Sequence, residues 1–147
     1  MSVVDPAAAI SAGRGWRRGL RDFRHPRLWR GVGWFGIALL LVLSLVRPPA
    51  VEMPVEDADK LGHFLAYFVL TGWYGQLFAA RRDFLKRAAG FVVLGAVIEG
   101  LQWFTGYRTA DWRDEVANST GIATAVLVTR WAVLGELLWR FERRLLH

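Results

Sequence analysis

Apolar residues in this chain gather in four blocks that short polar segments separate. The first block, residues 31–46, carries no charge, and with Leu28 and Trp29 it reaches about 18 residues, enough to span a membrane. Three more blocks of similar length follow. The pattern therefore predicts an all-α membrane protein with four transmembrane helices. Their expected ranges are 29–46, 61–80, 88–105 and 113–130.

Basic residues dominate both ends of the chain. Residues 14–30 hold seven arginines against one acid, Asp22, at spacings that suit an amphipathic helix on an anionic membrane surface. The plainer alternative is a block of positive charge that only sets the topology. After the fourth block, apolar residues recur every three or four positions from Trp131 to Leu145, which predicts a helical extension. We divide the chain into an arginine-rich arm (1–30), a four-helix domain (31–139) and a basic tail (140–147).

The distribution of Lys and Arg predicts the orientation of the helices. The arm, the turn at 81–87 and the region from Arg130 onward hold 15 of the 19 basic residues, whereas segments 47–60 and 106–115 hold two each. Basic loops stay on the cytoplasmic side. We therefore expect both termini in the cytoplasm and the first and third loops outside.

Charge and composition exclude several classes of protein. A net charge of +6 and a pI near 10.7 could indicate nucleic-acid binding, but the basic residues flank apolar blocks, so we expect no nucleic-acid partner. The absence of cysteine excludes disulfides and thiolate metal sites. About thirty residues precede the first apolar block, so we expect that block to be a retained helix and not a cleaved signal.

Polar residues stand at the predicted outer ends of three helices. Within each helix they are spaced by three or four positions, so each helix presents one polar stripe, and we expect the stripes to converge. A row of small residues at Ala117, Gly121 and Ala125 favours close packing of the fourth helix, and Gly72 and Gly75 could do the same on the second. The predicted ligand-binding residues are Asp59, Lys60, His63, Tyr67, Glu99, Gln102, Arg108, Asp111, Asp114 and Asn118.

An acid inside a membrane helix is costly, so Glu99 should face a partner such as Lys60, Arg108 or His63. The alternative is that this pairing only locks the helices together. His63 and Glu99 are candidates for acid–base catalysis, but no convincing nucleophile accompanies them, so no catalytic residue is assigned and a non-enzymatic role is favoured. With one histidine in the region and no HExxH-like pair, we expect no required metal, and no cofactor.

Two signatures carry a family resemblance. The segments DKLGHFLAYFVL (59–70) and IEGLQWFTGYRTADWRDEVANSTGI (98–122) resemble the VanZ-like family of small bacterial membrane proteins. The likeness covers roughly residues 39–127. One departure is Glu115, an acid where that family's pattern has an apolar residue. The resemblance implies a multi-pass protein of the bacterial cytoplasmic (inner) membrane, from a family whose founding member is associated with teicoplanin resistance.

The resemblance and the polar stripes together suggest a cell-envelope protein that affects glycopeptide susceptibility. Its ligand at the outward-facing polar site would be a membrane lipid. The candidates are a lipid-linked wall precursor and the lipophilic antibiotic itself. Lys60 and Arg108 would hold anionic groups, and the acids and amides would orient them. Two alternatives remain open: an enzyme that processes an envelope lipid with His63 as acid/base, and a structural subunit of a partner membrane protein.

Overall fold

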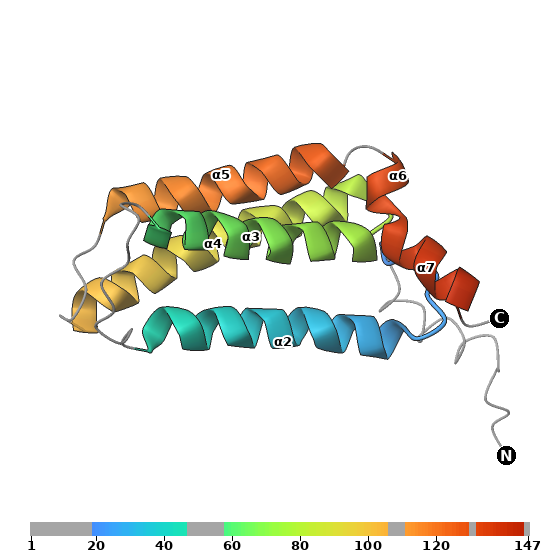
Figure 1. Ribbon diagram of the computed structural model, residues 1–147, viewed down its shortest axis with the longest axis horizontal. Coiled ribbons are helices and arrows are strands. Elements are labelled where there is room, and N and C mark those ends of the chain that lie inside the picture. The colour runs from blue at the N-terminus through green and yellow to red at the C-terminus, as the bar shows by residue number, and fades with distance from the viewer. Residues whose placement is uncertain (1–18, 47–57, 106–110, 130–131, 146–147) are drawn as a thin grey trace, which may run out of the picture.

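Four long helices and two short ones form the part of the chain that the computed structural model describes, which is residues 19–46, 58–105, 111–129 and 132–145. The chain is all-α there, apart from an isolated bridge between Leu20 and Phe78. The helices are α2 (Pro26–Leu45), α3 (Ala58–Leu77), α4 (Arg81–Thr105), α5 (Trp112–Thr129), α6 (Ala132–Gly135) and α7 (Leu137–Leu145) (Figure 1).

The long helices run side by side, and α6 and α7 lie across one end of the bundle (Figure 1). That end also carries the start of α2 and the connection between α3 and α4. The opposite end carries the starts of α3 and α5 and the end of α4. The two ends of the bundle therefore carry different helix termini, and each end gathers its own polar side chains.

Glycines set the spacing between α3 and α5. A methyl group on Gly121 would lie 2.3 Å from the backbone oxygen of Phe64, and one on Gly75 would lie 2.8 Å from Thr129 Cγ2. Neither position has room for a side chain, so the two helices approach closely there. The predicted packing role is thus confirmed for Gly121 and Gly75, whereas a side chain on Gly72 would meet nothing within 4 Å.

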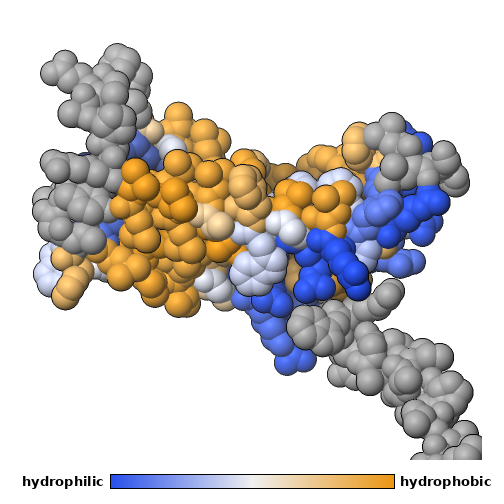
Figure 2. Space-filling model, turned by 90° about the horizontal axis from the view of Figure 1, so that it is seen from below, coloured by the Kyte–Doolittle hydropathy of each residue, from blue (hydrophilic) through white to orange (hydrophobic). Residues whose placement is uncertain are grey.

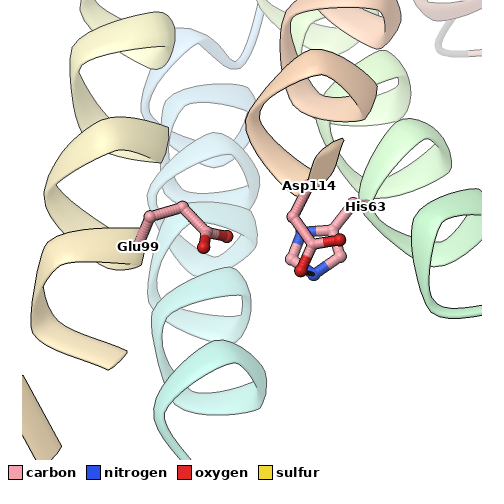
Figure 3. A group of neighbouring side chains, drawn as sticks. All are labelled: His63, Glu99 and Asp114. Carbon is pink, nitrogen blue, oxygen red and sulfur yellow. Dashed lines mark ion pairs between the residues drawn. The ribbon is translucent and has the colours of Figure 1, made fainter. Parts of the chain in front are cut away.

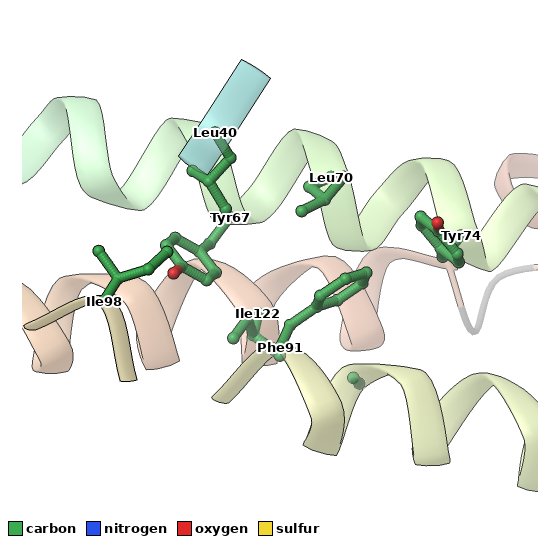
Figure 4. Close-up of a cluster of buried hydrophobic side chains, with 8 residues drawn as sticks. Leu40, Tyr67, Leu70, Tyr74, Phe91, Ile98 and Ile122 are labelled. Atoms are coloured by element: carbon green, nitrogen blue, oxygen red, sulfur yellow. The ribbon is translucent and has the colours of Figure 1, made fainter. Parts of the chain in front are cut away.

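An apolar core joins α2, α3, α4 and α5 at mid-bundle (Figure 4). Tyr74 and Phe91 meet edge to face with their ring centroids 5.0 Å apart. Such pairs add to the stabilisation that burial of apolar area provides. The buried members of the core are Leu40, Tyr67, Leu70, Tyr74, Ala88, Phe91, Ile98 and Ile122.

The outer surface of the bundle is apolar as well. Phe35 and Leu43 on α2 are 66% and 68% exposed, and Val69 on α3 and Val93 on α4 are each 64% exposed. Figure 2 shows an apolar surface over the middle of one face, with hydrophilic residues toward the end that carries α7. Exposed apolar patches of this kind mark surfaces that contact lipid or protein. Among the described helices, α2 is long and apolar enough to cross a membrane by length and composition.

The observed helices differ from the predicted ranges in informative ways. The expected amphipathic helix over 14–30 is wrong for residues 19–25, which are not helical, and residues 14–18 lie outside the described part. The Arg21 amide donates to the carbonyl of Leu77 (2.8 Å), and the Ala79 amide donates to that of Gly19 (2.8 Å). Gly19 has φ +92°, a conformation that suits glycine. Pairing with the α3–α4 connection therefore replaces helix formation in this segment.

The remaining boundaries differ mainly at helix starts. Pro26 opens α2 three residues before the predicted start, and proline is well suited to a first helical turn because its missing amide needs no partner there. The expected basic turn at 81–87 is instead the beginning of α4. The fourth predicted span (113–130) matches α5 within one residue at each end. The expected extension is helical in α6 and α7, with a break at Glu136.

A buried acid fastens α7 to the start of α2. Glu142 is 2% exposed and accepts hydrogen bonds from the amides of Arg24 (2.8 Å) and His25 (3.0 Å) and from the Trp29 indole (2.7 Å). We call this group the Glu142 anchor. Burial alone would raise the pKa of Glu142, but these hydrogen bonds hold that pKa below its ordinary value. The anchor explains why the C-terminal helix turns across the end of the bundle.

Candidate functional site

His63, in the second turn of α3, lies between two polar side chains of α5. Its Nδ1 is 3.1 Å from Asn118 Oδ1, and its Nε2 is 3.6 Å from Asp114 Oδ2. Asp114 and Asn118 are one helical turn apart and are both buried. The close approach at Gly121 brings α3 and α5 near enough for these contacts. The predicted stripes of the two helices therefore do face each other.

The orientation of Asn118 defines which histidine nitrogen donates. The Asn118 Nδ2 group donates to Glu115 Oε2 (3.3 Å), which turns Oδ1 toward the imidazole. An amide oxygen can only accept, so the Nδ1–H of His63 is the donor in this pair. Nε2 then faces the Asp114 carboxylate. A chain of polar contacts thus fixes the ring from both sides.

Glu99 brings α4 into the same group. One oxygen of Glu99, one of Asp114 and a ring nitrogen of His63 all lie within 4.8 Å of one another (Figure 3). One imidazole and two carboxylates are a donor set that Zn²⁺ accepts, so these are described residues that could hold a metal ion. We refer to His63, Glu99, Asp114, Glu115 and Asn118 as the His63 cluster.

Glu115 belongs to this cluster, although it is not among the ligand-binding residues predicted from the sequence. Its Oε1 accepts a hydrogen bond from Ser119 Oγ (3.4 Å), and its Oε2 accepts from Asn118. Gly95 on α4 makes room for it, since a methyl group there would lie 2.7 Å from Glu115 Oε2. The sequence held a usable signal. Glu115 precedes Asn118 and Ser119 by three and four positions, and Gly95 lies one turn before Glu99 on the same helix face.

The hydroxyl of Tyr67, on α3, lies next to the cluster at Gly95 of α4. A methyl group on Gly95 would lie 3.3 Å from both the Tyr67 hydroxyl and Asn118 Nδ2, so the hydroxyl borders the same small space. Tyr67 is 1% exposed, and within the described residues its hydroxyl has no hydrogen-bond partner. Buried hydroxyls are normally hydrogen-bonded. This oxygen is therefore a free donor and acceptor at the inner wall of the cluster.

Lys60 and two acids form the rim at this end of the bundle. Lys60 Nζ lies 3.5 Å from Asp59 Oδ1 and 3.6 Å from Asp111 Oδ2. Asp111 also caps α5, because its Oδ1 accepts from the Arg113 amide at 3.0 Å. Part of its role is thus to begin the helix that carries Asp114. The rim joins the start of α3 to the start of α5.

Two predicted residues are found neither in the cluster nor at its border within the described structure. Gln102 is buried, but its Nε2 donates to the backbone oxygen of Ser44 at 2.7 Å, so it ties α4 to α2. Arg108 lies outside the described residues. The described part of the site therefore contains more acids than bases. Glu99 and Asp114 lie beside His63, Glu115 contacts Asn118, and Asp59 and Asp111 lie on either side of Lys60.

Comparisons with known proteins agree with the resemblance. The model of the VanZ/LLP1 family matches residues 21–134. A protein of Schizosaccharomyces pombe (strain 972), described as "Uncharacterized protein C11E3.10", is 34% identical over 96 residues. That match covers 61% of this chain and 57% of the relative, so the chain spans less than two thirds of the relative's length. No solved structure matches the chain.

Proposed function

The chain belongs to the VanZ/LLP1 family, and from that premise we propose that it is a multi-pass membrane protein that binds the polar head of a lipid at the His63 cluster. Family membership and the apolar helix α2 together indicate a membrane protein. The proposal adds four transmembrane helices (α2 to α5), cytoplasmic termini and a location in the bacterial cytoplasmic membrane. The His63 cluster would then lie near the outer leaflet.

The helix lengths and the charges support this topology. The four long helices have 20, 20, 25 and 18 residues. At 1.5 Å per residue they are about 27–38 Å long, which matches a hydrocarbon core of about 30 Å. Most Lys and Arg residues of the described chain fall in segments 19–30, 81–87 and 132–145, and these segments belong to one end of the bundle (Figure 1).

The chemistry of the cluster favours a head group rich in hydroxyls or ammonium groups. Carboxylates and the Asn118 amide accept hydrogen bonds from sugar hydroxyls and amines, and Lys60 at the rim is suited to a phosphate oxygen. Arg108 would add a second cation there. A lipid-linked wall precursor, which combines sugar, phosphate and a long lipid, has all of these groups. A lipophilic glycopeptide such as teicoplanin shares the sugars and the lipid.

The observation that carries the proposal is the Tyr67 hydroxyl. It is buried, borders the cluster at Gly95, and has no partner among the described residues. A purely structural polar network would be expected to satisfy such a group from its own side chains. A ligand hydroxyl held between Tyr67 and the Asn118 side would satisfy it. Binding therefore explains the arrangement better than helix locking does.

The similarity to a protein of Schizosaccharomyces pombe favours a ligand that is not restricted to bacterial envelopes. The similarity shows that related sequences are not confined to bacteria. A head group with phosphate and sugar is a more general ligand than a glycopeptide antibiotic. The effect on glycopeptide susceptibility would then be a consequence of binding the lipid in a bacterial envelope.

The first experiment measures teicoplanin and vancomycin susceptibility in a sensitive bacterial host. The host expresses the wild-type chain, Asp114→Asn, Glu99→Gln or Tyr67→Phe at checked membrane abundance. We expect the wild type to raise teicoplanin tolerance and the three variants to lose most of that effect. Asp22→Asn is the matched control, since Asp22 is an exposed acid outside the cluster. Equal susceptibility of all strains, with and without the wild-type chain, would contradict the antibiotic role.

A second candidate is an enzyme that processes an envelope lipid with His63 as acid/base. The observation in its favour is the His63–Asp114 contact at 3.6 Å, because a carboxylate can orient and stabilise an imidazolium. His63→Gln separates the two ideas. Glutamine keeps hydrogen-bonding groups but cannot transfer a proton in this way. Retained tolerance in His63→Gln favours binding, and its loss at normal abundance favours catalysis.

A further inference from the structure

A cavity that contains no residue of the His63 cluster is lined by side chains of α2, α3 and α4 and of the short segments next to them. It has a volume of about 510 Å³, within the range of about 300–1,000 Å³ typical of small-molecule sites. Its walls are mostly aromatic and aliphatic. Its apolar lining includes Trp34, Ile37, Tyr74, Phe91 and Leu94.

Cationic side chains line one end of this cavity. Arg30 on α2 and Lys86 and Arg87 on α4 all contribute to its lining. The guanidinium carbon of Arg87 lies 5.5 Å from the centroid of the Phe78 ring, which keeps the cation at the cavity. Within the described residues, neither Lys86 nor Arg87 forms an ion pair. Two positive charges are thus available to a ligand.

The shape and charge match an anionic lipid. We infer that this cavity binds a negatively charged glycerophospholipid, with one acyl chain along Ile37, Phe91 and Leu94 and the phosphate at Lys86 and Arg87. Free phosphate would gain nothing from the apolar walls, and a neutral lipid would gain nothing from the two cations. An amphiphile with an anionic head uses both. With the topology proposed above, this cavity lies at the cytoplasmic leaflet of the membrane. That placement rests on the proposed function, but the binding itself does not.

Gly90 offers a steric test of the cavity. It lies on α4 among the lining residues, and a methyl group there would meet nothing within 4 Å. A Cβ atom can therefore be added at this position without disturbing the helix contacts. Gly90→Leu would occupy space that the acyl chain needs. Gly72→Leu is the matched control, because Gly72 also has nothing within 4 Å and does not line the cavity.

The experiment measures lipid retention by native mass spectrometry of the full-length chain in detergent. Phosphatidylglycerol and phosphatidylcholine with identical acyl chains are offered in turn, with inorganic phosphate as a competitor. A basic side chain close to the head group of an anionic lipid contributes about fivefold to binding of that lipid. We therefore expect Lys86→Gln and Arg87→Gln each to lower phosphatidylglycerol retention about fivefold. Arg82→Gln, which removes a nearby charge outside the cavity, should leave retention unchanged.

Several outcomes would overturn the inference. Equal retention of the two lipids by the wild type would show that charge does not select the ligand. Unchanged retention in both Lys86→Gln and Arg87→Gln, or in Gly90→Leu, would place the lipid elsewhere. Full displacement by inorganic phosphate would identify a phosphate site instead of a lipid site. All of the test variants change residues of this cavity and none changes the His63 cluster, so failure of the proposed function leaves this test intact.

Discussion

The two ends of the bundle each bury acidic side chains, but they treat those acids differently. At one end, Glu142 receives hydrogen bonds of 2.7–3.0 Å from two backbone amides and an indole, all from one segment of the chain. At the other end, Glu99 and Asp114 come from different helices and meet around one imidazole. The first arrangement surrounds a single charge with donors. The second brings like charges together.

This difference separates an anchor from a site. A carboxylate enclosed by N–H donors is stabilised in one position and has little capacity left for a ligand. Carboxylates gathered near one another raise each other's energy, and such arrangements persist at places where function requires them. Burial of an acid alone would not have distinguished the two regions. The two regions are distinguished by the atoms around each carboxylate oxygen, which are N–H donors at the anchor and other carboxylates at the cluster.

The largest expected effect is at the anchor. Glu142→Gln removes the charge and turns an amide N–H toward a backbone N–H, so the α7–α2 junction should lose about 3 kcal/mol, the upper end for hydrogen bonds to a charged group. Thermal unfolding in detergent measures the change. The same substitution at Glu99 also brings fewer like charges together in the His63 cluster, so it should lower the melting temperature by less. A melting temperature that falls equally in both variants would mean that Glu99 is also a structural residue.

A smaller loss is expected where α3 and α5 touch beneath the His63 cluster. Gly121→Ala would place a methyl group 2.3 Å from the carbonyl oxygen of Phe64, and a backbone atom cannot rotate away. Overpacking of this kind costs about 1–3 kcal/mol. The helices should also separate enough to lengthen the His63–Asn118 contact, so teicoplanin tolerance should fall as well. Gly72→Ala, which meets nothing within 4 Å, is the control for both measurements.

The sequence predicted the helices and much of the cluster because both follow from local periodicity. Positions spaced by three and four share a helix face, so His63, Glu99, Asp114 and Asn118 could be assigned to converging stripes. The resemblance to VanZ-like proteins pointed to the same residues. The predicted helix ranges were close to the observed ones because the apolar blocks have clear ends in the sequence.

The sequence could not predict contacts that depend on how the helices are rotated against one another. Glu115 enters the cluster only because Gly95, on another helix, leaves space for it. Gln102 faces Ser44 and not His63, although its spacing from Glu99 is consistent with either. The helix predicted over 14–30 is wrong for residues 19–25, because the Arg21 amide bonds to the carbonyl of Leu77, a partner 56 positions along the chain. Each of these is a tertiary contact that overrides the local pattern.

The smallest expected effect is the acid sensitivity of the anchor. The pKa of Glu142 is lower in the folded chain than its ordinary value of 4.5, so between these two values the unfolded chain binds more protons. The carboxylate therefore contributes stability that is fully present above about pH 4.5 and is lost as the pH falls through the folded pKa. Melting temperatures at pH 7, 5, 4 and 3 should decline at the acid end. Other acids also titrate there, and Glu136 has a lowered pKa through its hydrogen bond with Arg140. The difference between the wild type and Glu142→Gln isolates the anchor, and that difference should shrink toward pH 3. A constant difference across this range would show that the charge of Glu142 does not hold α7 in place.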